Sequence, residues 1–217
     1  TAVLSSGKRG IGAGAGNPPA LVDETADVQK AAEDIVNGCT FDNNLPCIAE
    51  KEIVVVDKVA DELMHHMIAE QGCYLASKEE QDALISVVLK GGQLNRKCVG
   101  RDARTLLGMI GVEAPDNIRC ITFEGPKEHP LITEELMMPI LGVVRADSFE
   151  DAVEKAVWLE HGNRHSAHIH SKNVDHITTY AKAIDTAILV KNGPSYSAIG
   201  FGGEGYCTFT IASRTGE

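Results

Sequence analysis

The sequence predicts an α/β fold, with a mostly parallel sheet and flanking helices. Short runs of β-branched residues, such as 53–56, lack polar alternation, which is typical of strands that are covered on both faces. Segments with apolar residues at helical spacing follow these runs along the chain. Because strand and helix alternate repeatedly, we expect parallel strands joined by right-handed crossovers.

The N-terminal elements follow from local patterns. The first nineteen residues are too rich in glycine for a stable helix and predict a turn-laden lead into a strand. Helical spacing over 28–36 predicts a helix that Thr25 caps and Gly38 ends. A buried strand over 53–56 follows, and we expect Asp57 to cap the next helix.

The remaining elements follow from capping and periodicity. Ser77 and Glu80 have the spacing of a capping box and predict a third helix. The glycine-rich stretch 91–115 predicts loops and short helices. Periodicity then predicts strands over 118–123, 140–144, 165–170 and 187–190, with helices over 149–157 and 174–184.

Composition limits the classes of function. With 217 residues and 43% hydrophobic content, the chain is long enough for one large or two small domains. The excess of 31 acidic over 20 basic residues gives a net charge of −11, which disfavours binding to nucleic acid or anionic membranes. No stretch approaches the roughly 20 apolar residues of a membrane-spanning helix. Small-molecule or protein partners are therefore expected.

The six cysteines contain no C-x-x-C pair, and a chain of this size does not need disulfides, so we expect a reducing, cytoplasmic setting. Cys47 lies between a helix end and a strand, in a segment of turn-forming residues where a thiol can be exposed and activated by backbone N–H groups. That pattern alone does not separate a reactive cysteine from a buried one. The other five are expected to be small buried apolar residues: Cys39, Cys73, Cys98, Cys120 and Cys207.

Five segments together resemble one family. Phe41-Asp-Asn-Asn-Leu-Pro-Cys-Ile-Ala-Glu-Lys51 resembles the nucleophile segment of the CoA-acylating branch of the aldehyde dehydrogenase superfamily, with the propionaldehyde and acetaldehyde enzymes of bacterial microcompartments as the nearest members. The other four, in the family's order, are Gly12-Ala-Gly-Ala-Gly-Asn-Pro-Pro19, His129-Pro-Leu-Ile-Thr-Glu-Glu-Leu-Met-Met-Pro139, Gly162-Asn-Arg-His-Ser-Ala-His-Ile-His-Ser171 and Asn192-Gly-Pro-Ser with Gly200-Phe-Gly-Gly-Glu-Gly205.

The resemblance implies a thioester mechanism. The Cys47 thiolate would attack a short-chain aldehyde, hydride would pass to NAD, and the acyl group would be transferred to coenzyme A. His165 matches a histidine of the acylating branch and would relay a proton to or from the CoA thiol. Aligned without gaps, Ala13 occupies the place where hydrolytic relatives have a glutamate, which predicts CoA rather than water as acyl acceptor.

The resemblance also implies binding residues. Glu135 matches a glutamate that binds a ribose hydroxyl of the nicotinamide nucleotide, although a solvated surface acid is the alternative. Met137 stands where hydrolytic relatives usually have an aromatic residue beside the cofactor, and the resemblance implies that it would pack there. Tyr206 and Phe209 lie in a segment beside the aldehyde tunnel, where substrate contact and core packing are both open.

A metal site is not expected. Histidines cluster in the chain, and two of them would share one face of a strand. No acidic or cysteine ligand set accompanies them, and the family needs no metal. The histidines concerned are His161, His165, His168, His170 and His176.

Residues 1–217 are expected to be a fragment of the aldehyde dehydrogenase catalytic domain, without most of the dinucleotide-binding domain and the C-terminal segment. The isolated fragment would then be inactive, and the whole protein a homo-oligomer with possible microcompartment shell partners. Two alternatives stay open. One is a cysteine-dependent esterase or hydrolase, which needs a base near the Cys47 thiol. The other is a non-catalytic interaction module that retains the fold.

Overall fold

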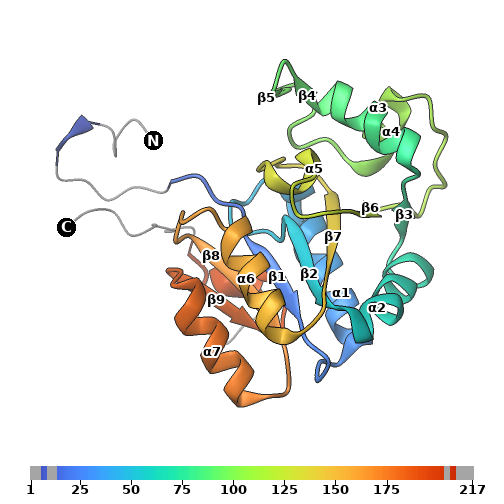
Figure 1. Ribbon diagram of the computed structural model, residues 1–217. Helices are drawn as coiled ribbons and strands as arrows, with labels where there is room; N and C mark the ends of the chain where they lie inside the picture. The colour runs from blue at the N-terminus through green and yellow to red at the C-terminus, as the bar shows by residue number, and fades with distance from the viewer. Residues whose placement is uncertain (1–5, 9–13, 203–205, 209–217) are drawn as a thin grey trace.

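The computed structural model describes residues 6–8, 14–202 and 206–208. These residues form a seven-stranded sheet in the order β3-β6-β7-β2-β1-β8-β9, in which every neighbouring pair is parallel (Figure 1). The expected α/β class is confirmed. The strands are β1 (Pro19–Val22), β2 (Glu52–Val56), β3 (Cys73–Leu75), β6 (Cys120–Glu124), β7 (Ile140–Ala146), β8 (Ser166–His170) and β9 (Ile188–Lys191).

Helices cover both faces of the sheet (Figure 1). α1 and α2 pack on one face, and α6 and α7 pack on the other. A small hairpin of β4 (Leu89–Lys90) and β5 (Gln93–Leu94) accompanies α3 and α4. The helices are α1 (Val28–Thr40), α2 (Asp57–Ala69), α3 (Lys78–Val88), α4 (Ala103–Met109), α5 (Pro130–Thr133), α6 (Phe149–Leu159) and α7 (Val174–Ile184), with 3-10 turns η2 (Phe41–Asn44) and η3 (Ser195–Ile199).

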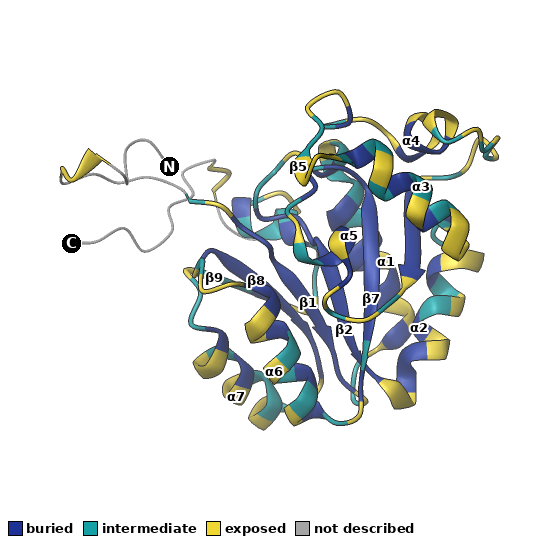
Figure 2. Ribbon diagram, turned by 45° about the horizontal axis from the view of Figure 1, so that its top comes forward, coloured by how far each residue is buried: buried dark blue, intermediate teal, exposed yellow. Residues whose placement is uncertain are grey.

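The β-branched run of β2 serves two cores. Ile53 and Val55 face the core under α1 and α2, whereas Val54 and Val56 face the core under α6 and α7. Alternate residues of a strand point to opposite faces, so a strand covered on both sides has no polar position. Figure 2 shows the consequence: the central strands are buried throughout, and the helices expose their outer faces.

Two expected helix starts differ from the structure. α1 is capped by Asp27, whose carboxylate accepts the Lys30 N–H at 3.3 Å, and not by Thr25. Asp57 is the first residue of α2, and the cap position is held by Val56 without a side-chain hydrogen bond. Both corrections shift a boundary without changing the element, because helix ends are less sharply specified by local sequence than helix interiors. The capping box of Ser77 with Glu80 is confirmed.

Gly38 does not end α1 but lies inside it. A Cβ atom at this position would lie 2.1 Å from Oε2 of the buried Glu50 side chain, so the absence of a side chain permits this contact. Other boundaries differ by one or two residues, and several short elements, among them β3, α5 and the β4–β5 hairpin, were not expected. No helix in the described ranges is long and apolar enough to span a lipid bilayer.

Replacement of Gly38 by alanine is expected to destabilise the fold by about 1–3 kcal/mol, because the new methyl group overlaps a buried carboxyl group. The matched control is Gly108→Ala in α4, where a Cβ atom meets nothing within 4 Å. That change should be neutral or stabilising by up to about 1 kcal/mol, since alanine favours helix. Urea unfolding of both variants measures the difference, and equal free energies of unfolding would contradict it.

Candidate active site

The predicted site residues gather at the edge where the central strands begin. Gly16 precedes β1, Cys47 precedes β2, Glu135 precedes β7 and His165 precedes β8. The sheet order β7-β2-β1-β8 makes these four strands neighbours. Because parallel strands all begin at one edge, segments that are far apart in the sequence converge there (Figure 1).

The loop that presents Cys47 is held in an unusual backbone conformation. Residues 42–44 all have left-handed φ angles, from 48° to 65°, a region that aspartate and asparagine adopt more readily than most residues. The buried side chain of Asn44 donates hydrogen bonds to Cys39 O and Glu50 O, each at 2.9 Å. This amide therefore ties the end of α1 to the segment that enters β2 and fixes both ends of the Cys47 loop.

Lys51 places a buried cation beneath the same loop. Its Nζ donates to Asn44 O at 3.1 Å and to Asn44 Oδ1. Burial lowers the pKa of Lys51, whereas the nearby acidic groups, with Glu135 foremost and Cys47 among them, raise it. This role was not expected from the sequence, because a lysine before a strand usually lies at the surface.

The Cys47 thiol is half-buried and its pKa is raised. Burial is the main cause, and the negative charge of Glu135 adds to it. The backbone N–H of Cys47 and the charge of Lys51 act in the opposite direction and lower the pKa. A thiolate is the nucleophilic form of cysteine. Lys51 is therefore the cation that favours ionisation of this thiol.

Replacement of Lys51 by methionine is expected to raise the pKa of Cys47 further, because the thiolate loses a favourable charge. Alkylation of Cys47 by iodoacetamide should then be slower at neutral pH and recover at higher pH. Lys51→Arg keeps the charge and serves as the conservative variant, and Lys58→Met removes an exposed lysine of α2. An unchanged pH dependence of alkylation in Lys51→Met would show that this charge does not act on the thiol.

His165 is buried against Gly16. A Cβ atom at Gly16 would lie 3.2 Å from Cγ of the His165 ring and 3.1 Å from Cys47 O, so this glycine lets the ring and the nucleophile loop approach each other. Burial and the charge of Lys51 lower the pKa of His165, which keeps the imidazole neutral at pH 7. A neutral imidazole can accept a proton.

The hydrogen bonds of His165 leave one ring nitrogen free. Its backbone N–H donates to Glu160 Oε1 at 3.0 Å, and its Nδ1 lies 2.9 Å from Ser166 Oγ. In the part of the chain that the structure describes, Nε2 is buried and has no hydrogen-bond partner. A Cys–His hydrolase would favour a hydrogen bond between the histidine and the thiol. Among the described residues, no hydrogen bond joins His165 to the Cys47 thiol.

Glu135 completes the cluster. It is half-buried, its Oε2 accepts the Gly16 N–H at 3.4 Å, and burial raises its pKa. Met137 follows on the same segment with a left-handed φ of 51°, and its carbonyl accepts the Gly100 N–H. The structure thus brings Cys47, His165 and Glu135 together around Gly16.

Several predicted residues lie elsewhere. Tyr206 is fully exposed, so the structure gives it no packed position in a core. Phe209 and Ala13 lie outside the described residues. Cys207 is exposed, which corrects its expected burial, because the segment that carries it does not pack into either core. The expected burial is confirmed for Cys39, Cys73, Cys98 and Cys120.

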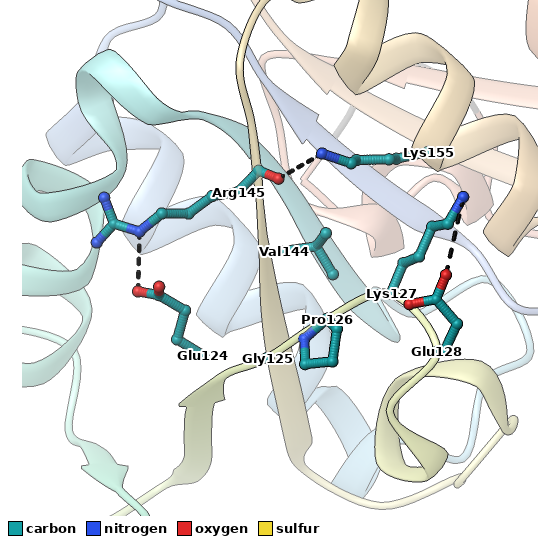
Figure 3. A pocket seen from close by; sticks show the side chains of 8 residues that line it. All are labelled: Glu124, Gly125, Pro126, Lys127, Glu128, Val144, Arg145 and Lys155. Atoms are coloured by element: carbon teal, nitrogen blue, oxygen red, sulfur yellow. Dashed lines mark hydrogen bonds and ion pairs between the residues drawn. The ribbon is translucent and has the colours of Figure 1, made fainter.

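An open pocket of about 520 Å³ lies at the opposite edge, where β6 and β7 end (Figure 3). Its cations are already paired: Arg145 contacts Glu124 at 2.9 Å, Lys155 contacts Arg145 O and Asp151, and Lys127 lies 4.0 Å from Glu128. Although open α/β sheets usually bind ligands at this edge, no unpaired group among these charges points to a ligand.

One group of residues within the described ranges has ligand atoms close enough to hold a metal ion: Asp23, Glu24 and His176. The Asp23 carboxylate is already engaged by Thr25, by Ser171 and by His176, whose Nδ1 lies 2.8 Å from Asp23 Oδ2. These bonds connect the ends of β1 and β8 and give Asp23 a structural role.

Comparison with known proteins identifies the family. The model of the Aldehyde dehydrogenase family matches residues 5–213. The chain is 47% identical over 215 residues to the propanal dehydrogenase (CoA-propanoylating) of Salmonella typhimurium, an alignment that covers 99% of this chain and 46% of that protein. The chain thus spans about half the length of the curated relatives it matches.

Two solved structures are also similar. The propionaldehyde dehydrogenase from the Clostridium phytofermentans fucose utilisation bacterial microcompartment is 79% identical, with a TM-score of 0.96 over 100% of this chain and 50% of that one. Structures of its cysteine-to-alanine and histidine-to-alanine variants are known. The Rhodopseudomonas palustris propionaldehyde dehydrogenase with bound CoA and an acylated cysteine is 52% identical, with a TM-score of 0.93 over 100% and 49%. The chain therefore belongs to the aldehyde dehydrogenase family.

Proposed function

We propose that the protein containing this chain is a CoA-acylating aldehyde dehydrogenase that oxidises a short-chain aldehyde, propionaldehyde or acetaldehyde, to its acyl-CoA. The observation that carries this proposal is the convergence of Cys47, a neutral buried His165 and Glu135 around Gly16. A nucleophile, a proton acceptor and a carboxylate at one edge are the groups that such a reaction needs.

Sequence spacing supports the roles of Cys47 and His165. In the Clostridium phytofermentans protein, the cysteine and the histidine that were replaced by alanine are separated by the same number of residues as Cys47 and His165. The acylated cysteine of the Rhodopseudomonas palustris protein supports a thioester intermediate in the family. We therefore assign Cys47 as the nucleophile and His165 as the group that moves a proton during transfer to CoA.

The chain's own residues account for the order of steps. The Cys47 thiolate attacks the aldehyde carbon, and the backbone N–H of Cys47 stabilises the resulting oxyanion. A nicotinamide nucleotide, for which we propose NAD and which Glu135 would help to hold, would supply the hydride acceptor for this carbon. The acyl group then remains on Cys47 as a thioester until the CoA thiol attacks it and Cys47 leaves as a thiolate.

Glu135 suits a role in binding the nucleotide. One oxygen, Oε2, already accepts the Gly16 N–H, which leaves Oε1 available to a ribose hydroxyl. A carboxylate is a good acceptor for a diol. Met137 would pack beside the nucleotide, and Tyr206 and Phe209 would contact the aldehyde. We further propose a cytoplasmic homo-oligomer that associates with microcompartment shell proteins, in line with the origin of the Clostridium phytofermentans structure.

The proposal is tested with the complete purified protein. Propionaldehyde or acetaldehyde is supplied with NAD or NADP, with and without CoA, and reduced nucleotide, acyl-CoA and free acid are measured. We expect NAD-dependent oxidation with acyl-CoA as the main product. Predominant free acid in the presence of CoA would contradict the acylating assignment, and nucleotide-independent ester hydrolysis would favour the hydrolase.

A further inference from the structure

Ser166 is the residue that holds the His165 ring. It is the fully buried first residue of β8, and its Oγ lies 2.9 Å from His165 Nδ1. Within the described residues this is the hydrogen bond found for the Ser166 hydroxyl, and no other partner competes with it. The pairing was not visible in the sequence, because neighbouring residues of a strand usually point to opposite faces.

Other contacts fix the backbone of His165 but not its ring. Its N–H donates to Glu160 Oε1, and its carbonyl accepts the Ile188 N–H at 3.2 Å. Gly16 limits how far the ring can move, yet a half-turn about the Cβ–Cγ bond would exchange the two ring edges at the same position. The bond to Ser166 selects one of these two orientations and leaves Nε2 as the free nitrogen.

We propose that Ser166 is a positioning residue for acyl transfer, which accepts the Nδ1–H of His165 and so keeps the Nε2 lone pair available to the CoA thiol. This inference rests on the proposed function. In the step concerned, the thiol proton passes to Nε2, a bond forms between the CoA sulfur and the acyl carbon, and the bond from that carbon to Cys47 Sγ breaks. The products are acyl-CoA, the Cys47 thiolate and protonated His165.

The serine hydroxyl suits both states of the ring. It accepts the Nδ1–H of neutral His165, and the same bond becomes stronger when the ring carries a positive charge. The charges around this ring are Lys51 from the segment before β2, Glu135 across Gly16, and Glu160 at the end of α6. None of them is hydrogen-bonded to a ring nitrogen among the described residues, so Ser166 Oγ is the group seen there that contacts a ring nitrogen and can hold the ring in one orientation.

The test separates the two halves of the reaction in the complete enzyme. Rapid mixing with aldehyde and NAD, without CoA, measures the burst of NADH that accompanies acyl-enzyme formation, and later addition of CoA measures transfer. Ser166→Ala is expected to keep the burst within about 2-fold of that of the unmodified enzyme and to slow transfer at pH 7 by about 10- to 100-fold. This loss is part of the contribution that a general base makes to the rate. Ser166→Thr retains the hydroxyl and should restore transfer. Thr122→Val removes a buried hydroxyl of β6 and should change neither half.

A double-mutant cycle shows whether Ser166 acts through His165. In a His165→Ala background, Ser166→Ala should slow transfer by less than about 2-fold, because its target is absent. An equal effect in both backgrounds, normal transfer in Ser166→Ala, or loss of the NADH burst in that variant would overturn the proposal. If Ser166→Ala does not fold, Ser166→Cys replaces it with the same expectations. Absence of a burst in the unmodified enzyme would instead refute the proposed function.

Discussion

Replacement of Cys47 by alanine is expected to abolish acyl-CoA formation, with a loss of about 10⁴-fold or more in the complete enzyme. The reason is that, among the described residues, Cys47 is the half-buried thiol that lies with His165 and Glu135 around Gly16. The buried thiols Cys39, Cys73 and Cys120 belong to the core on the α1 and α2 face. The NADH burst should disappear together with acyl-CoA, because hydride leaves only after the sulfur has attacked the aldehyde.

The matched control for this variant is Cys207→Ala, which removes an exposed thiol. We expect it to retain normal rates in both halves of the reaction. Two outcomes would show that Cys47 is not the nucleophile: near-normal acyl-CoA formation in Cys47→Ala, or a comparable loss in Cys207→Ala with folding intact. Circular dichroism of both variants checks that the fold is kept.

Replacement of His165 by alanine is expected to slow transfer to CoA by about 10²–10⁴-fold, the usual contribution of a positioned general base. The NADH burst should be retained, because the Cys47 thiolate depends on Lys51 and its own backbone N–H rather than on His165. The exposed His161 provides the control, and His161→Ala should leave both halves unchanged.

The pH dependence of transfer has a defined sign. Burial and Lys51 lower the pKa of His165 below its usual 6.5, so the ring stays neutral and able to accept a proton at and above neutral pH. Transfer by the unmodified enzyme should therefore persist as the pH falls towards 6.5 and decline below it. In His165→Ala this acid limb should be absent. An unchanged acid limb in that variant would assign it to another group.

Periodicity predicted the fold well because the central strands are covered on both faces. The uninterrupted apolar run of β2 predicts a buried strand, and the amphipathic pattern of α6 predicts a helix. Short elements such as β3, with three residues, carry too little pattern to be recognised. The course of α1 past Gly38 depends on the Glu50 side chain, a contact that local sequence rules do not include.

The site was predicted less completely, and for a physical reason. Family resemblance pointed to Cys47, His165 and Glu135, but not to the way in which parallel strands bring them to one edge. Lys51 and Ser166 escaped notice because their roles depend on burial and on partners from other segments. The usual rule for open α/β sheets favours the carboxyl edge, where the pocket of Figure 3 lies, whereas the site residues lie at the amino edge.

The most direct test of the central claim is peptide mass spectrometry of the acyl-enzyme. The complete enzyme is incubated with propionaldehyde and NAD without CoA, quenched, and digested. We predict a propionyl adduct on the peptide that contains Cys47, and its conversion to propionyl-CoA when CoA is added before quenching. An adduct on another residue, or loss of the adduct as free propionate while CoA is present, would contradict the account.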